Sequence, residues 1–204
     1  MLVDLPLVDL RGRRLVLASA SPRRAELLRS VGLSFDVVPA DIDESARPDE
    51  EPATYVARLS AEKARTVAER VGRDALVVAA DTTVDVDGRI LEKPHDDFDA
   101  RRMLRLLSGR THLVHTGVTT LSVGVGSGRA GSSVSVVVET AVRFVELTDR
   151  AIDWYLSTGE HEGKAGGYGI QGAAGAFVDR VEGSVTNVIG LPLAETLELL
   201  GTPS

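Results

Sequence analysis

The chain has 204 residues, of which 43% are hydrophobic and 26% charged, as is typical of a soluble globular protein with one sizeable domain or two small ones. It contains no cysteine, so disulfides, zinc–thiolate sites and thiol nucleophiles are excluded. The formal net charge of -7 argues against a general nucleic-acid binder, which needs a basic surface. No apolar run approaches the ~20 residues that span a bilayer, and the start of the chain does not resemble a secretory signal. We therefore expect a cytoplasmic protein whose partners include neither a membrane nor a nucleic-acid polymer.

The first informative segment joins a strand to a helix. Residues 15–18 are apolar and predict a buried strand, and a helix is expected to begin at Pro22 with Ser21 as its N-cap. Two arginines in the first helical turn are unusual, because that end of a helix favours acidic neighbours. The segment fits either a capped helix with solvated arginines or an anion site, most simply for phosphate. The candidate anion-binding side chains are those of Ser19, Ser21, Arg23 and Arg24.

An acidic loop and a long helix come next. Residues 34–38 predict a short strand, and residues 41–44, which end in Glu44, suit either a solvated turn or a Mg²⁺ or Mn²⁺ site. Residues 52–71 have the apolar spacing of a helix, with Lys63 in the middle of the apolar face. This lysine either extends along the edge of the core or points into a cleft. We favour the cleft because Leu59 and Val67 flank it on both sides.

Residues 75–80 are continuously apolar, as in a central strand that is covered on both faces, and they end at Asp81. A carboxylate at the end of a buried strand lies where open α/β sheets bind ligands, although an aspartate that only begins a turn is also common. A hairpin is expected around Asp87-Gly88 and leads to Lys93.

The remaining elements are mixed. We expect helices at 97–107, from Thr148 to Ser157 and at 192–201, and strands at 112–125, 133–145 and 176–181. Residues 124–133 are rich in glycine and serine and predict a hairpin tip rather than a domain boundary. Residues 1–204 are therefore expected to form a single domain.

Residues 163–175, the glycine loop, hold six glycines and a literal GxGxxG. A dinucleotide site is rejected, because no strand leads into the motif, no helix follows it, and no acidic residue lies at the required distance. The loop is either flexible or, as we favour, a backbone that approaches a ligand closely. In the second case Lys164 and Gln171 would contact the ligand, and Tyr168 and Ile170 would anchor the loop.

Arginine strongly outnumbers lysine among the basic residues. Of the 23 lysines and arginines, only Lys63, Lys93 and Lys164 are lysines, and each falls in a segment already singled out. This placement indicates positions that need a compact ammonium group. The four histidines have no metal-ligand spacing, and surface or strand positions account for them. Carboxylates beside clustered cations are typical of metal-dependent phosphate hydrolysis, in which the acids hold a divalent metal and activate water.

Several of these motifs together resemble the Maf family of nucleoside triphosphate pyrophosphatases, also called septum-formation inhibitors. The resemblance covers about residues 13–200 and rests on the order of SASPRR, the acidic loop to Glu44, Glu62-Lys63-Ala64, Asp81-Thr82, Glu92-Lys93-Pro94, residues 164–172 and Gly190-Leu191-Pro192. It implies an α/β fold like that of the inosine triphosphate pyrophosphatases, with a mixed twisted sheet, flanking helices and two lobes around a cleft. It also implies a divalent cation and, often, a homodimer.

The resemblance also assigns roles to residues. Asp81 matches the family's catalytic acid and, with Glu44, is expected to hold the metal. Lys63 and Lys93 match further active-site positions. The specificity positions of the branch that prefers dTTP and UTP match Arg23, Thr82 and Gln171.

The expected reaction is hydrolysis of dTTP and UTP to the monophosphate and pyrophosphate, by attack of water at the α-phosphorus. One alternative is a pyrophosphatase of the same fold for ITP, 7-methyl-GTP or another purine or modified nucleotide. The other is a non-enzymatic nucleotide-binding regulator of septation.

Overall fold

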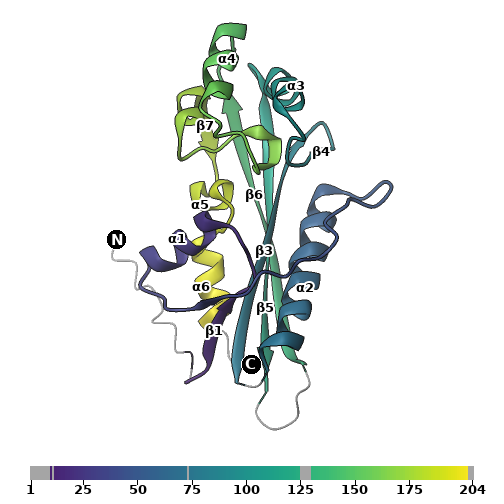
Figure 1. Ribbon diagram of the computed structural model, residues 1–204, viewed down its shortest axis with the longest axis vertical. Coiled ribbons are helices and arrows are strands. Elements are labelled where there is room, and N and C mark those ends of the chain that lie inside the picture. Colours follow the sequence, from purple (N-terminus) through teal and green to yellow (C-terminus); the bar gives the residue numbers. More distant parts are fainter. Residues whose placement is uncertain (1–9, 11, 73, 125–129, 202–204) are drawn as a thin grey trace.

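The computed structural model describes residues 10, 12–72, 74–124 and 130–201 (Figure 1). The segment considered for a secretory signal lies outside this range, apart from Leu10, and so does the part 125–129 of the expected hairpin tip. In chain order the elements are β1 (Arg14–Leu17), α1 (Pro22–Ser30), β2 (Asp36–Val37), α2 (Pro52–Val71), β3 (Ala75–Val86), β4 (Arg89–Leu91), α3 (Asp97–Leu107), β5 (Thr111–Val123), β6 (Ala130–Phe144), α4 (Asp149–Ser157), the 3₁₀ turns η1 (Ala165–Gly167) and η2 (Ala173–Phe177), β7 (Val178–Glu182), α5 (Val185–Ile189) and α6 (Leu193–Gly201).

The described strands form one mixed sheet in the order β2-β1-β3-β5-β6-β7, with β4 paired to β3 further along. β1 is parallel to β2 and β3, and the other pairs are antiparallel. The long strands β3, β5 and β6 connect a lower lobe, which carries α1, α2 and α6, with an upper lobe, which carries α3 and α4 (Figure 1). The expected α/β fold with a mixed sheet and two lobes is confirmed.

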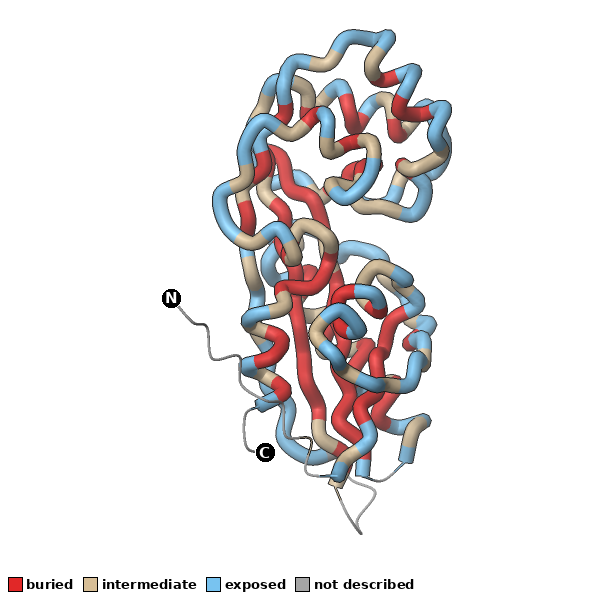
Figure 2. The backbone as a smooth tube through the Cα atoms, turned by 90° about the vertical axis from the view of Figure 1, so that its left-hand side faces the viewer, coloured by how far each residue is buried: buried red, intermediate tan, exposed pale blue. Residues whose placement is uncertain are grey.

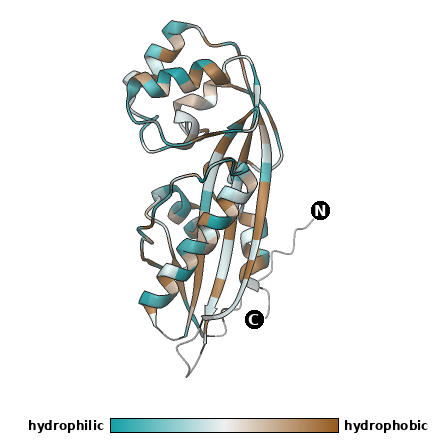
Figure 3. Ribbon diagram, turned by 90° about the vertical axis from the view of Figure 1, so that its right-hand side faces the viewer, coloured by the Kyte–Doolittle hydropathy of each residue, from teal (hydrophilic) through white to brown (hydrophobic). Residues whose placement is uncertain are grey.

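Helices cover both faces of the sheet in the lower lobe. Because side chains alternate along a strand, successive residues of β1 contact different helices. Leu15 and Leu17 pack with residues of α1 and α6, whereas Val16 packs with residues of α2. Buried residues run along the central strands through both lobes (Figure 2). Seen from the α2 side, the strands behind the helix are largely hydrophobic and the outward face of the helix is more hydrophilic (Figure 3).

The helix α2 lies very close to β5. A Cβ atom on Gly117 would lie 2.3 Å from the backbone oxygen of Val56, so only glycine permits this approach. The close packing sets the position of α2 relative to β3, and therefore the position of Lys63 relative to Asp81.

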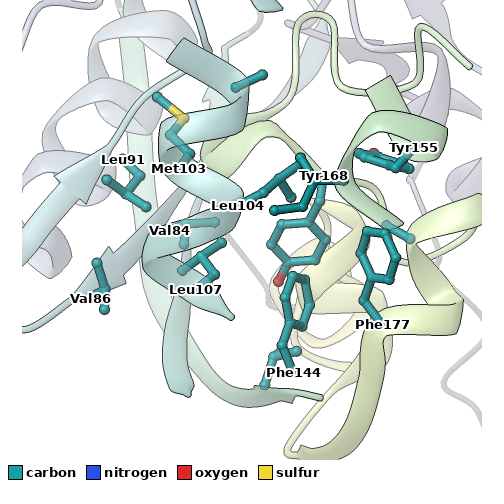
Figure 4. Packing of buried hydrophobic residues seen from close by; sticks show 14 of the residues in the cluster. Val84, Val86, Leu91, Met103, Leu104, Leu107, Phe144, Tyr155, Tyr168 and Phe177 are labelled. Atoms are coloured by element: carbon teal, nitrogen blue, oxygen red, sulfur yellow. The ribbon is translucent and has the colours of Figure 1, made fainter. Parts of the chain in front are cut away.

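The upper lobe has a core of its own. It contains an aromatic cluster of Phe144, Tyr155, Tyr168 and Phe177, packed beside Leu104 of α3 (Figure 4). Neighbouring rings in this cluster meet edge to face, for example Phe144 and Tyr168 with centroids 4.8 Å apart. This is a favourable arrangement for aromatic pairs. The cluster holds the glycine loop, which follows α4, against the ends of the central strands.

Several expected elements differ in the structure. β3 does not end at Asp81 but continues to Val86, and its pairing with β5 is unbroken. The short helix α5 was not predicted, because five residues show too little periodicity, although Ser184 caps it by accepting from the Asn187 N–H. β2 contains only two residues, and β7 begins at Val178 because the preceding residues form η2. Within the described ranges, no helix is both long and apolar enough to cross a membrane.

Candidate active site

A cavity of about 930 Å³ lies where segments of the two lobes meet. Its wall includes residues from the β1–α1 junction, the acidic loop, α2, β3, the glycine loop and the end of α5. Every site residue expected from the sequence lines it: Ser19, Ser21, Arg23, Arg24, Glu44, Lys63, Asp81, Thr82, Lys93, Lys164 and Gln171.

Asp81 reaches the cavity although it lies in the middle of β3. The parallel partner β1 ends at Leu17, opposite Val78, and β4 pairs with β3 only from Val84 onward. The edge of β3 between these two partners is therefore not covered by a strand. Because side chains alternate, Asp81 points to the face that carries α2 and Thr82 to the opposite face. The expected site at the end of a strand is therefore present, but the strand that ends there is β1, whereas β3 continues past Asp81.

Four charged side chains form a continuous chain of ion pairs in the cavity wall. The Lys63 Nζ lies 2.6 Å from Asp81 Oδ1 and 2.6 Å from Glu44 Oε1. Glu44 Oε2 in turn accepts from Lys93 Nζ at 2.8 Å. Lys63 and Asp81 are only 6% and 7% exposed, so water screens their interaction weakly. Lys63 therefore points into the cleft, as expected from its position on the apolar face of α2.

The acidic loop is held at Glu44, through ion pairs of its carboxylate and a hydrogen bond to its backbone oxygen. Partial burial would raise the pKa of Glu44, but hydrogen bonds from Lys63 and Lys93 outweigh it and lower the pKa to about 2. Glu44 therefore stays ionised at any pH near neutrality. The Tyr55 hydroxyl of α2 donates to the backbone oxygen of Glu44 at 2.9 Å. Tyr55 was missed in the sequence, since its helical spacing marks it only as a core residue.

Arg24 is held by acceptors from three parts of the chain. Its Nε donates to the Gly190 backbone oxygen at 2.8 Å, its Nη1 to Ser19 Oγ at 3.0 Å and its Nη2 to Thr82 Oγ1 at 3.1 Å. Burial lowers its pKa, which nearby Asp81 raises in part. Two guanidinium N–H groups remain for a ligand, because the side chain has five in all.

Thr82 extends this network into the sheet. Its Oγ1 lies 2.9 Å from Thr116 Oγ1, which donates to the Asn187 backbone oxygen at 3.1 Å. The Asn187 side chain is fully buried and donates to the Val114 oxygen and to Thr140 Oγ1, each at 2.9 Å. Thr116 and Asn187 were not expected from the sequence, where neither belongs to a motif with chemical meaning.

Arg23 and Ser21 are less constrained than Arg24. Ser21 occupies the N-cap position, but the cap bond expected from its hydroxyl is absent; instead its N–H donates to Ser19 Oγ at 3.2 Å. Arg23 is half-buried, which lowers its pKa, and within the described residues no hydrogen bond or ion pair holds its guanidinium. Both side chains lie in the cavity wall and are available to a ligand.

The glycine loop brings Lys164 and Gln171 to the cavity. Lys164 Nζ donates to the Glu160 backbone oxygen, and the Gln171 side chain is exposed. Packing within the protein accounts for Gly166, because a Cβ there would lie 2.8 Å from Val84 Cγ2. A Cβ on Gly169 would meet only the flexible end of the Lys164 side chain, 2.8 Å from its Cε. Close approach to a ligand is therefore not needed to explain Gly166.

Of the four histidines, only His161 differs from expectation. His112, His115 and His161 are buried, and only His95 is exposed. Strand positions account for His112 and His115, whereas His161 is held by a contact of 2.9 Å with Asp97 Oδ1. The surface position that we also expected for histidines therefore applies to His95 alone.

The chain is similar to known proteins over most of its length. The model of the Maf family, described as Maf-like protein, matches residues 14–202. A dTTP/UTP pyrophosphatase of Anaeromyxobacter dehalogenans (strain 2CP-C) is 54% identical over 92% of each chain. A protein of the same name from Caulobacter vibrioides is 50% identical over 93% of this chain and 95% of its own.

Two solved structures are less similar to the chain. The Ham1 protein of Staphylococcus aureus is 12% identical and has a TM-score of 0.44, over 65% of this chain and 72% of its own. A dITP/XTP pyrophosphatase of Mycobacterium abscessus is 19% identical with a TM-score of 0.39, over 66% of this chain and 75% of its own. The family match extends over nearly the whole length and includes every residue of the cavity wall. The chain belongs to the Maf family.

Proposed function

We propose that this protein hydrolyses dTTP and UTP to the corresponding monophosphate and pyrophosphate. The single observation that carries the proposal is the buried Lys63–Asp81 pair in the wall of a cavity that also holds Arg23 and Arg24. Such a cavity offers a base for water and cations for a triphosphate. The names of relatives that are 50% and 54% identical over nine-tenths of the chain support the same activity.

In the proposed reaction, a water oxygen bonds to the α-phosphorus while Asp81 accepts a proton from that water. The bond from the α-phosphorus to the oxygen that bridges it to the β-phosphate breaks, and pyrophosphate leaves with that oxygen and its electron pair. Lys63 holds the Asp81 carboxylate in position at 2.6 Å. Lys93, which Glu44 holds, offers its charge to the phosphate chain.

The family resemblance implies a divalent cation, and the side chains fit one that is shared with substrate. Asp81 and Glu44 supply the oxygen ligands that Mg²⁺ and Mn²⁺ prefer. In the described part of the chain, however, no group of three or more His, Asp or Glu side chains could hold a metal ion alone. Mg²⁺ often binds through one or two carboxylates and substrate phosphates, so we propose that Asp81 and Glu44 would hold it with the triphosphate. The bound ion would supply positive charge against the phosphate oxygens.

We assign choice of the base to Arg23, Gln171 and Thr82. Thr82 would act indirectly, because its hydroxyl is already bonded to Arg24 and Thr116. We assign phosphate binding to Ser19, Ser21, Arg24 and Lys164, whose polar groups line the same cavity. We further propose that the protein acts as a homodimer in the cytoplasm, on the ground of its family.

A nucleotide panel tests the proposed function. Purified protein is assayed for pyrophosphate release from dTTP, UTP, ITP and 7-methyl-GTP, with Mg²⁺, with Mn²⁺ and with a chelator. We expect the highest kcat/KM for dTTP and UTP, and loss of turnover with the chelator. Preference for ITP or 7-methyl-GTP would instead support the alternative substrate class. Binding of dTTP without pyrophosphate release would support a nucleotide-binding regulator.

A further inference from the structure

The glycine loop has little regular structure of its own, yet it carries two of the cavity residues. Lys164 and Gln171 stand on either side of Tyr168, and all three line the cavity. Three backbone N–H groups of the loop donate to residues outside it: Gly166 N to the Glu92 oxygen at 3.1 Å, Gly169 N to the Tyr155 hydroxyl at 3.3 Å and Ala173 N to Glu160 Oε2 at 2.9 Å. Ala165, Ile170 and Ala174 of the loop also pack against the upper-lobe core, so the position of the loop relative to the sheet depends on both hydrogen bonds and apolar contacts.

The Tyr168 side chain adds a buried polar contact with the sheet. It is 6% exposed and turns into the aromatic cluster beside Phe144 (Figure 4). Its hydroxyl lies 2.7 Å from the Nε2 of His112, which stands near the start of β5. The imidazole also meets the rings of Phe144 and Tyr168 edge to face, at 5.0 and 5.4 Å. A side chain of the rigid sheet thus binds the middle of the loop.

Among the described residues, the imidazole of His112 has one polar partner, the Tyr168 hydroxyl. His112 is 2% exposed, and its Nδ1 is buried without a hydrogen-bond partner among the described residues. An unpaired buried nitrogen is unfavourable, and an apolar ring of similar size would avoid that cost. An imidazole at this position can form the hydrogen bond to Tyr168, and an apolar ring cannot. Burial lowers the pKa of His112 to about 4, so this bond joins two neutral groups near neutral pH.

We propose that His112 is a positioning residue for nucleotide binding, which acts through Tyr168 to hold Lys164 and Gln171 against the bound nucleotide. This inference rests on the proposed function. Asp81 and Lys63 lie on β3 and α2 and are attached to the protein independently of the loop. Loosening the loop therefore weakens binding and leaves the chemical step of the bound nucleotide largely intact.

The first test separates binding from turnover. His112→Phe and Tyr168→Phe each keep a ring and remove the bond, and we expect KM for dTTP to rise roughly tenfold with kcat changed less than about threefold. His112→Gln, which keeps a polar group at the end of the side chain, is expected to restore much of the affinity. His115→Gln is the matched control, because His115 is buried on the same strand and its polar partners, Asp85 and Glu139, lie outside the loop. An unchanged KM in folded His112→Phe protein would overturn the proposal.

A double-mutant cycle tests whether His112 acts through the loop. In a Lys164→Ala/Gln171→Ala background, His112→Phe is expected to raise the dTTP dissociation constant by less than about twofold, since the groups that it positions are gone. If His112→Phe raised the dTTP dissociation constant by the same factor in the wild-type and in the Lys164→Ala/Gln171→Ala background, His112 would have a general structural role and the proposal would be refuted. If the wild-type protein releases no pyrophosphate from any nucleotide, the proposed function fails, whereas the dissociation constants still test His112.

Discussion

Replacing Asp81 by asparagine is expected to lower kcat for dTTP by roughly 1,000-fold or more. The amide has the shape of the carboxylate but cannot accept the proton of the attacking water. Folding should survive the change, because Lys63 keeps Glu44 as a partner at 2.6 Å. KM should change far less than kcat, since the arginines and lysines that would hold the nucleotide remain. Steady-state kinetics of pyrophosphate release measure both effects.

The matched control for this change is Asp85→Asn. Asp85 lies on the same face of β3 and is similarly buried, but its carboxylate pairs with His115 at 3.4 Å and does not line the main cavity. We expect kcat within a few-fold of wild type for this variant. If Asp81→Asn retained more than a tenth of wild-type activity, or if both variants lost activity equally, Asp81 could not be the base.

Replacing Lys63 by methionine has the second largest expected effect. The ammonium lies between Glu44 and Asp81 and is 2.6 Å from an oxygen of each. Without it, two carboxylates face each other and Asp81 is buried without its cation, an arrangement that proteins tolerate poorly. We expect kcat to fall by roughly 100-fold or more, together with a measurable loss of stability to urea. Turnover and urea unfolding are measured on the same preparation.

Lys63→Arg sharpens the same test. The guanidinium fork is larger than an ammonium and cannot replace a compact charge that is shared by two carboxylates, so we expect little rescue. Arg65→Met serves as the control, because Arg65 is on α2 but exposed and absent from the cavity wall. Near-normal activity of Lys63→Arg would contradict the argument that this position requires a lysine.

Much of the candidate site could be predicted because its residues stand in local patterns. The spacing of Leu59, Lys63 and Val67 places a lysine on an apolar helix face, and the structure has it there, 6% exposed. The apolar run before Asp81 predicts a buried strand, and the glycines of the loop mark a segment with unusual backbone. Each of these signals lies within about ten residues along the chain, which is the range over which side-chain periodicity operates.

What could not be predicted depends on pairs that are distant in sequence. The bond from Arg24 to the Gly190 oxygen joins residues 166 positions apart, and that from His112 to Tyr168 joins residues 56 apart. Neither pair follows from a helical or strand period. The continuation of β3 past Asp81 was missed for a related reason. The apolar run is followed by the polar residues 81–83, and the strand can be recognised there only from its pairing with β5.

The most direct test of the account is to follow oxygen from the attacking water. Purified protein hydrolyses dTTP in water enriched in ¹⁸O with Mg²⁺ present, and mass spectrometry locates the label in the products. We predict one labelled oxygen in thymidine monophosphate and none in pyrophosphate, with turnover slower by roughly 1,000-fold or more in Asp81→Asn. Label in pyrophosphate, or formation of thymidine diphosphate and phosphate, would contradict attack at the α-phosphorus.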